Sequence, residues 1–171
     1  ARAIHDVPIT DAMPQLAAAL DRPGLASDVV IRRAISANFR LGGEAQVASL
    51  CAFSADKKNA ANWRAEALQA LGDLAQGTRR DRVYGDWRPR AAGNRAMAAA
   101  ALAPLLPALL AAGPEKVRIA SAYAAGELKV VSAREHLALL CADKKIPPSL
   151  RKSTLQALDK MGHPHLERIA L

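Results

Sequence analysis

The sequence predicts an all-α fold: a right-handed α-α superhelix of about four helix pairs with one long insertion loop. Two observations lead to this prediction. Of the 171 residues, 51% are hydrophobic but only 4% are aromatic, so the apolar residues are mostly alanine and leucine, which favour helices. The chain also repeats part of its own sequence, as arrays of stacked helices do. Alternation of apolar and polar residues, the pattern typical of strands, is nearly absent.

The repeat consists of two short segments that return 87 residues later. The tripeptide DKK at 56–58 returns at 143–145, and the tetrapeptide LQAL at 68–71 returns at 155–158. One HEAT-type helix pair takes roughly 40–47 residues. The spacing therefore predicts two HEAT-like pairs between one copy and the next.

Glycine and proline residues divide the chain into a succession of helices. Gly42 and Gly43 stop one helix, Pro104 and Pro107 are expected to kink or split another, and Pro114 lies in the first turn of the next. Helix N-caps are predicted at Asp28, Asn62 and Ser132. The predicted helices span residues 11–20, 28–41, 44–53, 63–75, 95–112, 114–128, 133–142 and 147–161.

Both ends of the chain lack the polar capping repeat that closes a natural array. Residues 1–4 are typical of the tail of a helix that began earlier, and residues 164–171 begin a new helix. We therefore expect residues 1–171 to form a single HEAT-like domain that is an internal fragment of a longer chain.

Two cysteines, Cys51 and Cys141, each follow a leucine just before a copy of the repeat. We expect them to occupy equivalent positions two layers apart, or about 20 Å if neighbouring helices pack at roughly 10 Å. A disulfide needs Cα atoms within about 7 Å, so both are predicted to be free, buried core residues. The two cysteines do not indicate in which cellular compartment the protein lies. The sequence has no apolar run of about 18 residues, so no transmembrane segment is predicted.

Residues 76–93, QGTRRDRVYGDWRPRAAG, are too long for the tight turn that links helices in a repeat array. The net charge of the chain is +8, and six arginines against two aspartates between Arg79 and Arg95 supply +4 of it. Long insertions of this kind are usually functional or disordered. The candidate docking surface comprises Arg79, Arg80, Arg82, Tyr84, Trp87, Arg88 and Arg90.

Three roles are open for this insertion. Tyr84 and Trp87 can pack back on the helices, the segment can dock another domain or protein, or arginines and aromatic rings can bind nucleic acid. The rest of the chain alternates acidic and basic residues, which suits solvated helix faces. Nucleic acid is therefore the least favoured partner. A HEAT-type DNA-repair enzyme would need an acidic and an aromatic residue together, for which Asp86 and Trp87 are the only candidates.

Three segments resemble a known family. ARAIHDVPI at 1–9, WRAEALQALGDLA at 63–75 and RRDRVYGDWRPR at 79–90 resemble the HEAT-repeat region of bacterial multidomain dehydrogenase-like proteins. Those proteins join a β-propeller of the glucose/sorbosone dehydrogenase type, a HEAT segment and a haem-binding domain with a CxxCH motif. Their insertion is similar to DRVTGRWRP, and residues 81–89 match most of it. The main departure is Tyr84, where the family usually has a small polar residue.

The resemblance implies a non-catalytic scaffold or spacer that positions domains within a larger exported or periplasmic redox protein. It places the haem in a separate domain, and this chain has no CxxCH motif to attach one. Two alternatives remain: a stand-alone HEAT adaptor that binds a protein partner on its concave face, and a HEAT-type DNA-binding or repair protein.

No catalytic, cofactor-binding or metal-binding residues are predicted in this chain. His163 and His165 flank a proline without an acidic or cysteine partner nearby. Glu135 and His136 lack the second histidine of HExxH. The serines show no catalytic order with a histidine and an acid.

Overall fold

The computed structural model describes residues 1–7, 9–164 and 166, without the side chain of Arg79. It is mostly helical, which confirms the all-α class. The predicted helix within 164–171 lies largely outside the described residues. The helices are α1 (Arg2–Asp6), α2 (Met13–Ala18), α3 (Asp28–Leu41), α4 (Glu44–Ala55), α5 (Ala61–Asp73), α6 (Arg95–Leu102), α7 (Leu106–Ala111), α8 (Glu115–Leu128), α9 (Arg134–Ala142) and α10 (Pro148–Lys160).

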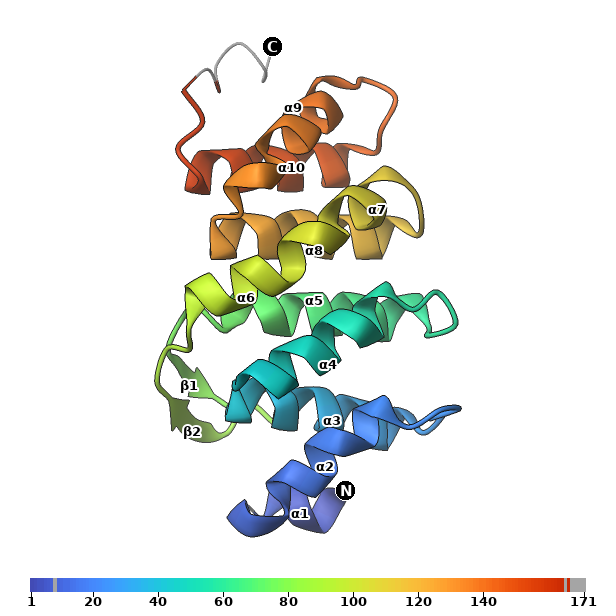
Figure 1. Ribbon diagram of the computed structural model, residues 1–171, viewed down its shortest axis with the longest axis vertical. Coiled ribbons are helices and arrows are strands. Elements are labelled where there is room, and N and C mark those ends of the chain that lie inside the picture. The colour runs from blue at the N-terminus through green and yellow to red at the C-terminus, as the bar shows by residue number, and fades with distance from the viewer. Residues whose placement is uncertain (8, 165, 167–171) are drawn as a thin grey trace.

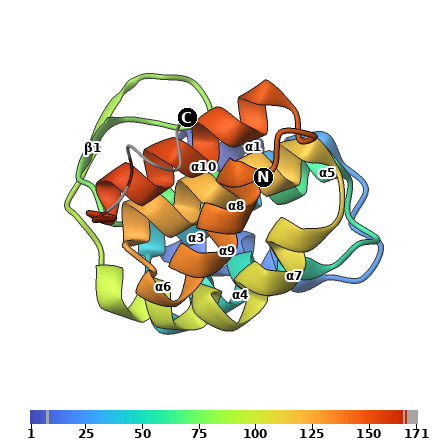
Figure 2. The same cartoon turned by 90° about the horizontal axis from the view of Figure 1, so that it is seen from above.

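The helices lie in two rows along the long axis of the molecule (Figure 1). The first row contains α3, α5, α8 and α10, and the second contains α2, α4, α6 with α7, and α9. Within the first row, α5 packs on α3 and on α8, and α10 packs on α8. Seen from above, the rows lie on opposite sides and the insertion arches away from them (Figure 2). One apolar core runs through the stack from Ala19 to Met161.

The first-row helices begin at Asp28, Ala61, Glu115 and Pro148, so their starts are 33, 54 and 33 residues apart. The middle step is longer because it contains the insertion. The 87-residue repeat therefore spans two helix pairs, as predicted, but one step is 54 residues long and the other 33.

The helix boundaries agree with the prediction more closely than the caps do. Pro104 lies in a 3-10 turn, Ala103–Leu105, that splits the predicted 95–112 helix into α6 and α7. The three predicted N-caps form no capping hydrogen bond: Asp28 and Asn62 lie in the first turns of α3 and α5, and Ser132 lies in a 3-10 turn before α9.

The repeated segments make equivalent contacts, which correct the alignment of the two cysteines. Arg64 Nε donates to the carbonyl of Ser54 at 2.7 Å, and its copy Arg151 donates to the carbonyl of Cys141 at 2.9 Å. Cys141 is thus equivalent to Ser54 and not to Cys51. Both cysteines are free and buried, as predicted. Burial raises the pKa of Cys51 to about 11.

Two equivalent glycines let the first-row helices approach closely. Gly72 in α5 and Gly126 in α8 are each the twelfth residue of their helix. A Cβ at Gly72 would lie 2.8 Å from the ring of Tyr123, and one at Gly126 would lie 2.7 Å from the Cα atom of Ala157. Any larger residue at Gly126 therefore collides with the backbone of α10.

The insertion at 76–93 contains a two-stranded antiparallel hairpin, β1 (Thr78–Arg80) and β2 (Trp87–Arg90). Thr78 pairs with Arg90 and Arg80 pairs with Trp87, with an irregularity between the two pairs. The predicted loop is therefore partly β-structure. Its strands are too short and irregular to show the alternation by which strands are recognised in sequences.

Candidate functional site

Asp81 builds the turn of the hairpin. Its Oδ1 atom accepts hydrogen bonds from the N–H groups of Val83 at 2.8 Å and Tyr84 at 3.2 Å, a common use of aspartate in turns. The Asp81 N–H donates to the carbonyl of Asp86 at 2.8 Å. Gly85 adopts φ 76°, in the left-handed region where glycine is favoured. The turn thereby leaves the Oδ2 atom of Asp81 facing the helices.

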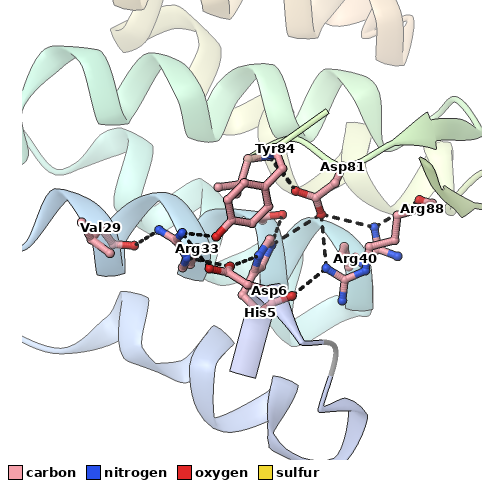
Figure 3. Close-up of polar contacts among 10 residues, drawn as sticks. His5, Asp6, Val29, Arg33, Arg40, Asp81, Tyr84 and Arg88 are labelled. Carbon is pink, nitrogen blue, oxygen red and sulfur yellow. Dashed lines mark hydrogen bonds and ion pairs between the residues drawn. The ribbon is translucent and has the colours of Figure 1, made fainter. Parts of the chain in front are cut away.

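The Oδ2 atom of Asp81 joins three segments that are distant in sequence (Figure 3). It lies 3.4 Å from Arg88 Nη1 of β2, 3.8 Å from Arg40 Nη1 of α3 and 3.6 Å from His5 Nε2 of α1. The side chain of Asp81 is only 1% exposed. A buried carboxylate is stable only when it is paired and hydrogen-bonded. Asp81 therefore ties the hairpin to Arg40 of α3 and lies against the ring of His5 in α1.

Main-chain carbonyls complete this junction. Arg88 Nη1 also donates to the carbonyl of His5 at 2.7 Å, and Arg40 Nη1 donates to the carbonyl of Arg88 at 3.3 Å. Burial lowers the pKa of Arg40, as do the neighbouring charges of Arg88 and Arg90, while Asp81 raises it. The carboxylate of Asp81 thus offsets part of the positive charge that Arg40 and Arg88 bring to this junction.

A second ion pair joins α1 to α3 beside the hairpin. Arg33 binds Asp6 in bidentate fashion, with Nε 2.9 Å from Oδ1 and Nη2 3.0 Å from Oδ2. Arg33 Nη2 also donates to the hydroxyl of Tyr84, whose ring centroid lies 5.3 Å from the guanidinium carbon. The hydrogen bonds from Arg33 lower the pKa of Asp6. Tyr84 therefore anchors the hairpin turn to α3.

His5 lies at the centre of this arrangement and is fully buried. Its Nδ1 lies 3.1 Å from Asp6 Oδ1, and its Nε2 lies 2.9 Å from Ser36 Oγ. Burial lowers the pKa of His5, although the carboxylates of Asp81 and Asp6 raise it. The imidazole is thus neutral near pH 7, with Nδ1–H donating to Asp6 and the hydroxyl of Ser36 donating to Nε2.

The connectivity of Ser36, His5 and Asp6 is that of a serine-hydrolase triad. No sequence pattern brings these three residues together, because Ser36 is 31 residues from His5. Ser36 is only 1% exposed, however, and Asp6 is already paired with Arg33. A substrate carbonyl has no access to the hydroxyl in this conformation, so the arrangement supports the fold and not nucleophilic attack.

The remaining inward arginines of the hairpin contact α3 and α5. Arg82 Nη1 donates to Asp73 and its Nη2 donates to Glu66 at 3.1 Å. The guanidinium carbon atoms of Arg82 and Arg90 lie 5.2 and 4.7 Å from the ring centroid of Phe39. Both arginines thus cover an aromatic ring of α3, and burial lowers the pKa of Arg90.

The predicted docking residues divide into two groups. The first group, whose guanidinium groups turn toward the helices, is Arg82, Arg88 and Arg90. The second group, which is exposed, is Arg80, Tyr84 at 47% and Trp87 at 67%. The side chain of Arg79 lies outside what the structure describes. The hairpin therefore packs on the helices chiefly through arginines, whereas the prediction considered packing through its two aromatic residues.

His5, Asp6, Arg33 and Arg40 could not be identified as site residues from the sequence. These residues reach Asp81 from distant parts of the chain, and no local spacing connects them with it. One signal was present: the segments at 1–9 and 79–90, which carry the family resemblance, supply opposite sides of this junction.

Comparison of the chain with protein-family models, curated proteins and solved structures gave no match. Among the described residues, no group of three or more His, Cys, Asp or Glu side chains is arranged to hold a metal ion. His165, one of the two histidines considered for a metal, lies outside those residues. No helix in the described part of the chain is long and apolar enough to cross a bilayer.

Proposed function

We propose that this chain is a non-catalytic scaffold of the HEAT type, a right-handed α-α superhelix that positions protein domains or partners. One observation carries the proposal: the hairpin is fixed to α3 through the buried carboxylate of Asp81 and to α1 through Arg88, while Trp87 is 67% exposed. Burying a charge costs free energy, and a fixed geometry is one reason to retain it. Exposed tryptophans on rigid supports are typical anchors of protein interfaces.

The family resemblance supports a more specific form of this proposal. In it, the chain is a spacer within a larger exported redox protein whose haem lies in a separate domain. A stack with one continuous core sets a fixed distance between the segments that flank it, as electron transfer between domains requires. A stand-alone adaptor would use the same hairpin to bind a separate partner.

The pairing of the arginines disfavours nucleic acid. Phosphate binding depends on Lys and Arg side chains that are available to neutralise phosphates. Arg82 is engaged by Asp73 and Glu66, and Arg88 by Asp81. The aromatic side of the hairpin is better suited to a protein surface.

The experiment is photocrosslinking in the complete natural polypeptide that contains this chain. A benzophenone amino acid replaces Trp87, and the same probe replaces Gln15, an exposed residue of α2, as a control. The proposal predicts that the probe at Trp87 crosslinks to one defined segment, within the same polypeptide or a partner, which mass spectrometry identifies. Crosslinking of neither position, or equal crosslinking of both, would contradict a docking role.

A further inference from the structure

The exposed side of the second row of helices carries almost no charge. Residues 96–112, which form α6 and α7, contain no polar or charged side chain. A helix that is apolar on every side is normally covered by protein on every side. The exposed residues of this segment are nevertheless Ala96, Ala100, Pro104, Pro107, Ala108, Ala111 and Ala112. The segment therefore presents an uncovered apolar surface.

This surface continues onto the neighbouring helices α4 and α9, which pack beside α6 and α7. The exposed residues in the middle of α4 are Ala45, Ala48 and Ala52. Leu139 of α9 lies 87 residues after Ala52, at the repeated position, and is 74% exposed. We call the exposed side chains of α2, α4, α6, α7 and α9 the outer face. Large exposed apolar areas mark binding sites, and the centres of interfaces are depleted of charged residues.

The charges of the outer face lie at its two edges and differ in sign. The second-row helices all run toward the loops that lie opposite the hairpin (Figure 1). At the edge where these helices begin, the exposed charged residues are three acids and one base: Asp11, Glu44, Glu135 and Arg95. At the edge where they end, there are five bases and three acids: Arg22, Lys57, Lys58, Lys144, Lys145, Asp21, Asp56 and Asp143. One edge therefore carries −2 and the other +2.

Edges of opposite sign make this face complementary to itself. If a second copy is turned over about an axis along the stack, its second-row helices lie antiparallel to those of the first copy. The −2 edge of each copy then meets the +2 edge of the other, and the uncharged middles meet. Turning the copy over about an axis along the helices would instead bring like edges together. Two-fold contacts between identical surfaces are also the commonest in homo-oligomers.

A projecting side chain and a recess lie close together on the outer face. The recess, of about 80 Å³, is lined by apolar side chains of α7, among them Leu106 and Leu110, and by His136 of α9. Leu139 projects into solvent one helical turn after His136. Two copies related by a two-fold axis between these features can each place Leu139 toward the recess of the other.

We propose that the outer face binds a second copy of this chain, with the second-row helices of the two copies antiparallel. The middle of the contact buries short apolar side chains, so no charged group there loses its water. The hairpin arches away from the second row (Figure 2). The contact therefore leaves Trp87 accessible, and the inference goes beyond the docking role proposed for the hairpin.

The first experiment measures the molecular mass of the chain by analytical ultracentrifugation, at protein concentrations from about 1 µM to about 1 mM. We expect a reversible equilibrium between monomer and dimer. The mass should reach a plateau at two copies because a two-fold contact closes on itself. A monomer at about 1 mM, or assemblies that keep growing with concentration, would overturn the proposal.

The second experiment locates the contact with two charge-matched variants. Ala100→Glu with Ala108→Glu places two carboxylates in the middle of the outer face, at exposed helical positions that glutamate suits. Gln69→Glu with Gln156→Glu adds the same charge to exposed positions of the first row. We expect the first variant to raise the dimer dissociation constant at least about a hundredfold, and the second to change it about twofold or less. Equal effects would place the contact elsewhere.

An exchange of charge between the two edges tests the antiparallel arrangement. Glu44→Lys is one variant and Lys57→Glu with Lys58→Glu is the other, and each brings like charges together at both edges of its own dimer. In a mixture, one copy of each variant forms a pair in which both edges attract again. We expect each variant alone to dimerise at least about tenfold more weakly than the natural chain, and the mixture to regain the natural affinity within about threefold. A mixture that dimerises no more tightly than the separate variants would contradict this arrangement.

Discussion

The four first-row helices place their sixth, ninth and thirteenth residues on one face, of which the half on α3 is covered by other segments and the half on α8 and α10 is not. On α3, Arg33, Ser36 and Arg40 are covered by α1 and the hairpin, which supply Asp6, His5 and Asp81. On α10, Gln156 and Lys160 at the ninth and thirteenth positions are exposed and line a recess, whereas Ala120 of α8 and Ser153 of α10 at the sixth position are buried within the stack. The insertion is therefore part of the fold at one end of the face and leaves the other end available.

The difference follows from the side chains at the equivalent positions. Arg33 and Arg40 in α3 are largely buried and need carboxylates from other segments. At the same positions α10 has Ser153, which donates to the carbonyl of Ile119, and Lys160, which pairs with Glu127. The stack thus keeps one core while single residues decide whether a face is covered or exposed.

The largest change in stability is expected for substitutions in the apolar core. Leu68→Asp places a charge at a fully buried position of α5 and should cost more than about 4 kcal/mol of unfolding free energy. Leu155→Asp, at the repeated position of α10, should cost only about 1–2 kcal/mol because Leu155 is partly exposed. Urea unfolding followed by circular dichroism measures both. Equal losses would mean that the two halves are packed alike at this position.

The next prediction concerns the ion pairs by which the hairpin is held against α3. Asp81→Asn leaves Arg88 and Arg40 without their buried carboxylate and should cost about 3–5 kcal/mol. Asp86→Asn, at an exposed position of the same hairpin, should change stability by less than about 0.5 kcal/mol. Urea unfolding of both variants checks this. A small effect of Asp81→Asn would show that the hairpin is not tied to the stack by this group.

A third prediction concerns the close contact between α8 and α10. Gly126→Ala should destabilise by about 1–3 kcal/mol because the new methyl group meets the backbone at Ala157. Gly72→Ala should cost less, since its nearest neighbour is the ring of Tyr123, a side chain. Thermal unfolding ranks the two. Stabilisation by Gly126→Ala, the usual result in a helix interior, would contradict this packing.

The prediction with the smallest expected effect concerns the pH dependence of the unfolding free energy. Burial lowers the pKa of His5, so between its ordinary value of 6.5 and its lower folded value the unfolded chain binds the extra proton. The unfolding free energy should therefore fall as pH falls through this window. His5→Gln should flatten this part of the profile, whereas His136→Gln, at an exposed position of α9, should not. Unfolding free energies between pH 5 and pH 7 test it, and an unchanged slope in His5→Gln would contradict the assignment.

The helices could be predicted from the sequence because their signals are local. Gly42 adopts φ 61° and ends α3 where the pattern predicts, and Pro114 precedes α8. The repeated DKK segments could likewise be found in the sequence. In each, the side chain of the aspartate accepts a hydrogen bond from the N–H group of the second lysine at 2.9 Å, which is a local contact. These features depend on neighbours in the chain.

The junction around Asp81 could not be predicted because it depends on segments that meet only in the folded chain. His5 and Arg40 are far from Asp81 in sequence, and nothing in their spacing indicates a shared contact. The charge excess of the insertion was visible, but which of its arginines turn inward depends on carboxylates of other elements, such as Glu66 for Arg82.

The most direct test of the covered half is native-state hydrogen exchange measured by NMR. The amides of Asp81 and Val83 donate to Asp86 and Asp81 within the hairpin turn. If the buried ion pairs hold the hairpin on the stack, these amides should exchange within about tenfold of the rate at Ile35 in the core of α3. Exchange as fast as in an unstructured loop would contradict the claim that the hairpin is a fixed part of this fold.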